Sequence, residues 1–83
     1  MNEYNQLILN LDKLHTTDLG IERIRKNLCL EQEDVVGWCR SAILKPNADI
    51  IRRGENWYIS VVECVITVNA YSYTIITAHK LKK

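Results

Sequence analysis

The sequence contains two histidines, His15 and His79, and an imidazole is the side chain best suited to exchanging protons near neutral pH. His79 ends a stretch of polar and β-branched residues that also contains Tyr73. We predict His79 as the acid or base of any catalytic site, with Tyr73 nearby and Glu63 opposite it to orient the ring. The alternative is an exposed histidine at a strand end that only pairs with Glu63 across the sheet.

A second candidate site begins at His15, where Thr16 and Thr17 precede Gly20 and Arg23. If a helix begins here, its first amides are free donors, the threonine hydroxyls add further donors, and Gly20 lets an anion come close. We therefore predict Thr16, Thr17, Gly20 and Arg23 as anion-binding residues. The alternative is an ordinary threonine cap of a helix, with His15 in a surface linker.

If the two histidines met, with Arg52 or Arg53 adding a fixed positive charge, the set would contain an acid, a base and an oxyanion stabiliser. That combination suffices for cleavage of a phosphodiester without a metal. The arginines could equally protect an edge strand from aggregation.

We predict no metal site and no cofactor. The three cysteines, Cys29, Cys39 and Cys64, lack the close spacing of a zinc site, and nucleotide-binding and acyl-transfer motifs are missing from the sequence. Cys39 and Cys64 are expected to be buried and Cys29 to be more exposed.

The composition of the chain limits the classes of partner that it is expected to bind. The net charge is +1, from 11 basic and 10 acidic residues, which argues against a protein held to nucleic acid or membrane by bulk electrostatics. No apolar run is long enough for a membrane span, and an odd number of cysteines without an export signal predicts a reduced, cytoplasmic protein.

Spacings of three and four between apolar residues predict three helices in the first half of the chain. The first occupies the first fourteen residues. The second begins near Thr17 or Asp18, and the third follows the acidic run at 31–34 and stops before Pro46.

After Ile50 the apolar period changes to two and β-branched and aromatic residues dominate, which predicts strands. Residues 53–56 form a tight turn around Gly54, and Ala70-Tyr71-Ser72 join the last two strands. Residues 57–69 could be two strands joined tightly at Val62-Glu63 or one bent strand, and we favour two. This register would place Thr67 opposite Ile75 and Glu63 opposite His79.

The fold class expected is α+β: three N-terminal helices packed on a three- to four-stranded antiparallel meander sheet. Residues 1–83 form a single domain, with a helical half at 1–45 and a sheet half at 49–80. The predicted core comprises Leu7, Leu11, Ile24, Leu28, Val35, Cys39, Trp57, Ile59, Ile66 and Ile76. The predicted polar face of the sheet carries Tyr58, Ser60, Thr67, Asn69, Tyr73, Thr77 and His79.

Three segments carry long polar signatures: Leu14-His15-Thr16-Thr17-x-x-Gly20-x-x-Arg23-Ile24-x-x-Asn27-Leu28, then Asn56-Trp57-Tyr58, then residues 67–80. Together they resemble a family of short bacterial proteins of unknown function, over nearly the whole chain. The resemblance implies no activity, cofactor or catalytic residue, but both histidines lie inside the signatures.

The layout of helices followed by a meander is also similar to the small ribonuclease fold shared by barnase, colicin and RelE-type toxins. This similarity implies RNA cleavage, although those toxins are usually strongly basic.

The reading we favour is a non-enzymatic binding or interaction module, whose partner could be a protein or RNA. The alternatives are a metal-independent ribonuclease-like or RNA-binding domain that uses His79 and His15, and a binder of small anions. If the last strand has a free edge, we expect a homodimer through Tyr73–His79.

Overall fold

The structure is a computed structural model that describes residues 3–61 and 63–81 of the 83-residue chain. Its helices are α1 (Glu3–Leu9), the short 3-10 helix η1 (Leu11–Lys13), α2 (Asp18–Leu28) and α3 (Val35–Ile43). Its strands are β1 (Asp49–Arg53), β2 (Asn56–Ser60), β3 (Cys64–Asn69) and β4 (Ile75–Lys80). The predicted α+β class is confirmed, with four strands in the sheet.

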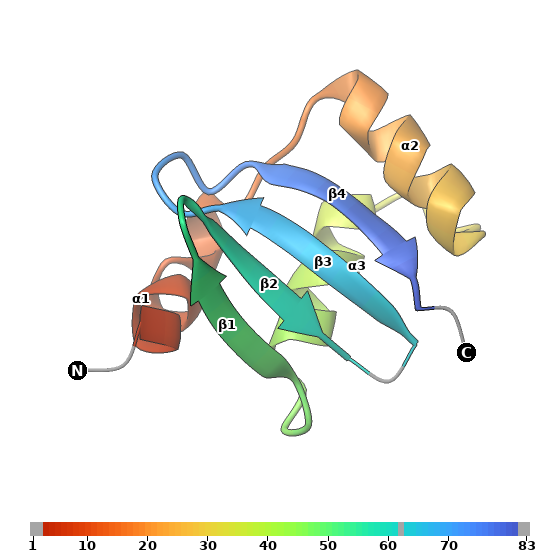
Figure 1. Ribbon diagram of the computed structural model, residues 1–83. Coiled ribbons are helices and arrows are strands. Elements are labelled where there is room, and N and C mark those ends of the chain that lie inside the picture. Colours follow the sequence, from red (N-terminus) through yellow and green to blue (C-terminus); the bar gives the residue numbers. More distant parts are fainter. Residues whose placement is uncertain (1–2, 62, 82–83) are drawn as a thin grey trace.

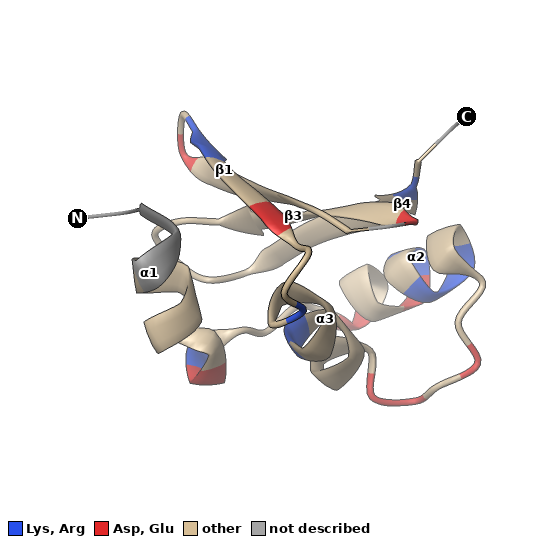
Figure 2. Ribbon diagram, turned by 90° about the horizontal axis from the view of Figure 1, so that it is seen from below, with Lys and Arg blue, Asp and Glu red and all other residues tan. Residues whose placement is uncertain are grey.

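The strands form one antiparallel sheet in the order β1-β2-β3-β4, as a meander requires. All three α-helices lie on the same side of this sheet, so within residues 3–61 and 63–81 no helix covers the opposite side (Figures 1 and 2). The molecule therefore has two layers, and the open face of the sheet is defined here as the side turned away from the helices.

Side-chain caps start two of the helices where the sequence predicted. Thr17 caps α2 by accepting a hydrogen bond from the Gly20 amide at 3.0 Å, and Asp34 caps α3 by accepting from the Gly37 amide at 2.9 Å. These caps satisfy amides that a helix start leaves without an intrahelical partner. α3 ends before Pro46, as expected.

The first helix is shorter than predicted. It ends at Leu9, and a separate 3-10 turn continues from Leu11 to Lys13. Asn10 marks the break, and its side-chain amide donates to the main-chain oxygen of Gln6 at 2.7 Å. Asparagine favours such local bonds to the main chain, which compete with helix continuation. Leu7 and Leu11 are still both buried.

Gly54 closes the β1–β2 hairpin with a two-residue loop, as predicted, and its φ of 61° is a conformation that glycine adopts without steric cost. The join between β2 and β3 falls between Ser60 and Cys64, where it was expected. Val62 itself lies outside the described residues.

The predicted pairing of the last two strands is wrong by two residues. His79 pairs with Val65 and Thr77 with Thr67, rather than with Glu63 and Val65. The loop between β3 and β4 is longer than three residues and includes Tyr73 at a positive φ of 60°, so β4 begins later than a tight turn would allow.

A β-bulge in β4 corrects a second prediction. Val68 pairs with Ile75 and Thr67 with Thr77, so Ile76 is an extra residue without a partner of its own. Ile75 is therefore buried at 1% exposure, whereas Ile76, which was predicted in the core, is 40% exposed on the open face.

The rest of the predicted core is confirmed, because the other nine side chains are all buried in one cluster between helices and sheet. Tyr73 is a further correction. It was expected on the open face, but its ring packs beside buried Trp57, with centroids 5.5 Å apart, at the end of the sheet nearest η1. The remaining predicted members of the open face follow the observed alternation of the strands.

Candidate functional site

The structure brings two of the polar signatures together at one end of β4. The main chain of His15 runs beside the start of β4: its amide donates to Tyr73 O at 3.2 Å, and the Ile75 amide donates to His15 O at 2.8 Å. Segments about sixty residues apart in the sequence are thereby joined. We define the His15 cluster as His15, Asn69, Ser72 and Thr74.

Hydrogen bonds hold the His15 ring at both nitrogens. Nδ1 lies 2.8 Å from Lys13 O, and because a carbonyl only accepts, Nδ1 must carry a hydrogen. Nε2 lies 3.0 Å from the Thr74 hydroxyl, which donates to it when the ring is neutral. A substrate proton could reach Nε2 only if Thr74 moved aside.

The cluster continues from Thr74 through side chains of the β3–β4 loop. The Ser72 hydroxyl lies 2.7 Å from that of Thr74, and the Asn69 side-chain oxygen accepts from the Tyr71 amide, the Ser72 amide and the Ser72 hydroxyl. An asparagine that binds amides two and three residues ahead is a turn-forming residue. The His15 cluster therefore shapes the loop that carries it.

Helix α2 is fixed along the edge of β4 by two further signature residues. The Thr16 hydroxyl donates to Ile75 O at 2.9 Å, and the Asn27 side-chain amide donates to Ala78 O at 3.1 Å. α2 lies beside β4 in Figure 1. The Tyr73–His79 segment is thus not the free edge on which the predicted homodimer depended.

The predicted anion-binding residues are close in sequence, but several of their donors are already in use. Thr16 donates to β4, Thr17 accepts from Gly20, and Ile21 donates to Thr17 O. Arg23 is exposed on α2, and the Asp18 carboxylate stands in the same first turn. An anion here would meet a capped helix with a negative neighbour, and binding by these four residues stays a prediction.

The two histidines are not brought together. His15 lies beside Thr74. His79 follows Thr74 by five residues along extended chain, which places the α-carbons of Thr74 and His79 about 16 Å apart. His79 is exposed, and within the described residues no hydrogen bond or ion pair joins it to Glu63. Tyr73 lies at the His15 end, with the Lys13 ammonium 5.6 Å from its ring centroid. The predicted catalytic set is therefore divided between the two ends of β4.

Arg52, which was considered as a source of positive charge beside the two histidines, contacts two aromatic rings. Its guanidinium lies between the rings of Trp57 and Tyr71, 5.7 and 5.6 Å from their centroids, and its Nε donates to Gly54 O at 2.9 Å. Cation–π contacts of this kind hold an arginine against aromatic faces. Arg53 is exposed at the end of β1.

Among the described residues, no three His, Cys, Asp or Glu side chains gather closely enough to hold a metal ion. No described helix is long and apolar enough to cross a membrane.

The cysteines follow their predicted burial. Cys29 is exposed at the end of α2, while Cys39 and Cys64 are buried. Burial, and in second place the nearby Cys64, raises the pKa of Cys39 to about 12 from an ordinary 9.0. Burial also raises the pKa of Cys64. Both buried thiols are kept protonated and out of reach of solvent.

We expect an aromatic disulfide reagent at mildly alkaline pH to modify one thiol per folded chain rapidly, because only a thiolate attacks and only Cys29 is accessible. Cys39 and Cys64 should react at least about a hundredfold more slowly until the chain unfolds. Absorbance of the released thiolate measures this, and Cys29→Ser should abolish the fast phase. Two fast thiols in the folded protein would contradict the burial described here.

Sequence reasoning missed Asn69, Ser72, Thr74 and Asn27 as site residues. The run from Asn69 to Thr74 contained a signal for a side-chain-stabilised turn, since asparagine and serine form such turns. For Asn27 there was no such signal, because its partner lies on β4, 51 residues away.

One comparison with known protein families gives a match that covers most of the chain. A family model described as "Protein of unknown function (DUF3781)" matches residues 8–79, which include η1, α2, α3, β1, β2, β3 and most of β4. No curated protein and no solved structure matches the chain. With nearly all of its folded length inside this match, the chain belongs to the DUF3781 family of proteins of unknown function.

Proposed function

We propose that this protein is a non-enzymatic interaction module that binds another protein on the open face of its sheet. The observation that carries the proposal is that the two central strands place only uncharged side chains on this uncovered face. β2 contributes Asn56, Tyr58 and Ser60, and β3 contributes Val65, Asn69 and Thr67, of which Thr67 is buried at 7% exposure by its neighbours. Figure 2 shows the three helices on the other side.

Apolar groups on this face support a protein partner. Ile51 and Ile76 are 45% and 40% exposed on the two outer strands, and Tyr58 and Val65 are half-buried between them. Aromatic and aliphatic groups among hydroxyls and amides are typical of protein interfaces, whose centres are poor in charge. An exposed apolar area on a small protein also favours such a role.

The same face is poorly suited to RNA. Proteins bind a nucleic-acid backbone through lysine and arginine, and β2 and β3 supply neither to the open face. On β1 the single arginine of this face, Arg53, is accompanied by Asp49. The separation of His15 from His79 likewise removes the paired imidazoles that a metal-independent ribonuclease would use.

The test compares two substitutions of matched type, Ile76→Lys on the open face and Leu19→Lys on the exposed side of α2, where Leu19 is 73% exposed. Both replace an exposed aliphatic side chain by the same cation. Proteins captured from source cells by the wild type are identified, purified and titrated against each variant. We expect at least about tenfold weaker binding for Ile76→Lys and unchanged binding for Leu19→Lys.

A second arm addresses RNA directly. Fluorescent single-stranded RNA is incubated with the wild type, His79→Ala and His15→Ala in metal-free buffer, and thermal unfolding shows that each variant is folded. We expect neither cleavage nor binding by the wild type. Cleavage that His79→Ala abolishes at unchanged melting temperature, or a protein partner equally well bound by Ile76→Lys, would overturn the proposal.

A further inference from the structure

The two edges of the sheet differ in how the rest of the chain covers them. At β4, His15, Thr16 and Asn27 bind outward-directed main-chain groups of Ile75 and Ala78. At β1, no hydrogen bond from elsewhere in the described residues reaches the main chain of Ile50. An edge strand of this kind is a template for a further strand.

The hairpin fixes which main-chain groups of β1 face outward. Arg53 and Asn56 close a two-residue loop, so they form a hydrogen-bonded pair, and the alternation of an antiparallel ladder makes Ile51 and Asp49 bond to β2 as well. The N–H and C=O groups of Ile50 and Arg52 therefore point away from β2, toward the outer edge.

The sequence of β1, Asp49-Ile50-Ile51-Arg52-Arg53, is complementary to itself when it is reversed. If two copies run antiparallel about Ile51, Asp49 of each lies opposite Arg53 of the other, and the two Ile51 side chains meet on the axis. Opposite charges directly across a ladder stabilise the pairing. Asp49, Ile51 and Arg53 share the open face, and all three are exposed.

We propose that β1 is a self-association edge, and that a second copy of this chain pairs with it about a two-fold axis through Ile51. The hydrogen bonds use the outward main chain of residues 50 and 52 and leave the Arg52 side chain on Trp57 and Tyr71. Each partner presents the same surface, as a two-fold interface requires.

The directions of the main-chain groups select this register. Outward-facing residues must lie opposite outward-facing residues, so Ile50 can meet only residue 50 or 52 of the second copy within the strand. Pairing residue 50 with itself would place Asp49 opposite Ile51. Pairing residue 50 of one copy with residue 52 of the other gives every one of the five β1 residues a partner in the second copy. In this register each Asp49 lies opposite the Arg53 of the other copy.

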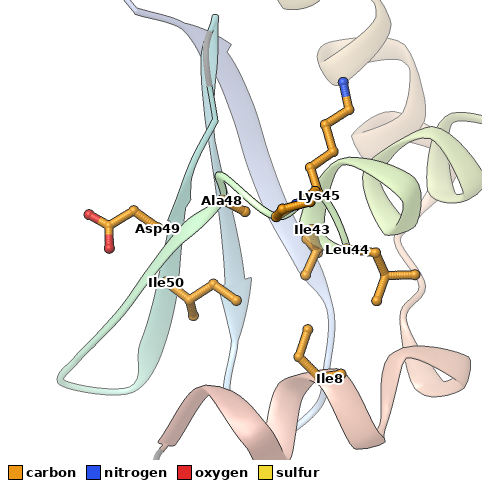
Figure 3. Close-up of a pocket in the computed structure, with 8 residues that line it drawn as sticks. Ile8, Ile43, Leu44, Lys45, Ala48, Asp49 and Ile50 are labelled. Atoms are coloured by element: carbon orange, nitrogen blue, oxygen red, sulfur yellow. The ribbon is translucent and has the colours of Figure 1, made fainter.

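A hollow lined by both aliphatic and polar residues lies beside this edge. Its volume is about 380 Å³, and Figure 3 shows Ile8 of α1, Ile43 of α3 and Ile50 of β1 around it, while Asp49 points away to the other side of β1. Leu44 lines the same hollow and is 55% exposed. The two-fold axis puts both helical layers on one side, so the hollows of the two copies become neighbours, and exposed aliphatic side chains at the hollow such as Leu44 lose contact with water.

The pairing would join two four-stranded sheets into one continuous sheet with both open faces on the same side. The inference goes beyond the proposed function and does not depend on it, because no partner protein takes part in the experiments below. The protein could bind a partner as a monomer, which would support only the proposed function. It could also dimerise without binding a partner, which would support only this inference.

The first experiment measures mass by light scattering during gel filtration. The wild type is expected at twice the chain mass of 9.7 kDa. Asp49→Arg and Arg53→Asp each place like charges opposite one another twice, and each should raise the dimer dissociation constant at least about tenfold. An equimolar mixture of these two variants should dimerise again, because both cross-strand pairs are then complementary. Asp18→Arg, the same charge change on exposed α2, should leave the dimer intact.

A second experiment tests the position of the axis. In a Cys29→Ser background, Ile51→Cys places two thiols opposite one another at a non-hydrogen-bonded pair, whose α-carbons lie about 4.5 Å apart. That separation permits a disulfide, so mild oxidation should give a covalent dimer on non-reducing gels. Ile76→Cys, at a similarly exposed position of the open face, should remain monomeric on the gel.

A wild-type mass of 9.7 kDa at high micromolar concentration overturns the proposal. The proposal is also overturned if the Asp49→Arg variant still dimerises, the mixture of the two charge variants dimerises no more tightly than either variant alone, and Ile51→Cys gives no cross-link. The two copies would then associate through another surface.

Discussion

Ile75→Ala is expected to lower the free energy of unfolding by about 3 kcal/mol, whereas Ile76→Ala should lower it by less than about 1 kcal/mol. The two positions are adjacent and carry the same side chain, but Ile75 is 1% exposed and Ile76 is 40% exposed. The free energy lost at Ile75 has two sources: apolar contacts are removed, and a cavity is left in a packed core. At Ile76 most of the side chain already meets solvent.

Urea unfolding followed by tryptophan fluorescence measures both changes, since Trp57 lies in the same core as Ile75. The pair is its own control, because composition and charge are the same in the two variants. Equal losses, or a larger loss at Ile76, would show that β4 lacks the bulge that turns Ile75 inward.

Gly20→Ala is expected to lower the free energy of unfolding by about 1–3 kcal/mol, although alanine is the better helix former by about 1 kcal/mol. A Cβ at Gly20 would run into the hydroxyl of Thr16 and come within 3.3 Å of that of Thr17. The Thr16 side chain would have to rotate and give up its hydrogen bond to Ile75 O, which fixes α2 to the sheet.

A double-mutant cycle isolates this contact. In a Thr16→Ala background the obstructing hydroxyl is missing, so the same Gly20→Ala change should be neutral or should stabilise by up to about 1 kcal/mol. Chemical denaturation of the four proteins gives the coupling free energy. Equal effects of Gly20→Ala in the two backgrounds would mean that Thr16 and Gly20 do not crowd one another.

Local sequence patterns predicted most of the fold. Thr17 and Asp34 marked helix starts, Pro46 limited α3, and Gly54 located a hairpin. Such features depend on residues within a few positions of one another, which is why the sequence predicts them. The burial of nine of ten predicted core residues follows from helix and strand periodicity in the same way.

Most of the predictions that failed concern the pairing of β3 with β4, and the first helix, which ends at Leu9 and does not fill the first fourteen residues, is a separate case. A strand register is set by the length and conformation of the preceding loop, and Tyr73 at positive φ had no glycine-like signal in the sequence. The bulge at Ile76 then reversed the inward and outward positions of two isoleucines. Because the register differs from the predicted one, Glu63 does not pair with His79 as expected.

By itself the sequence determined an α+β chain of three helices and a meander, a near-neutral charge, one exposed and two buried cysteines, and polar signatures around both histidines. Only the tertiary structure decided that His15 is bound to Thr74 while His79 lies at the other end of β4. It also decided that Asn27 binds the outer edge of β4, whereas no hydrogen bond from elsewhere in the described residues reaches the main chain of Ile50 in β1. The physical reason is range: periodicity and capping are local, whereas register, edge coverage and the meeting of segments sixty residues apart depend on how the whole chain packs.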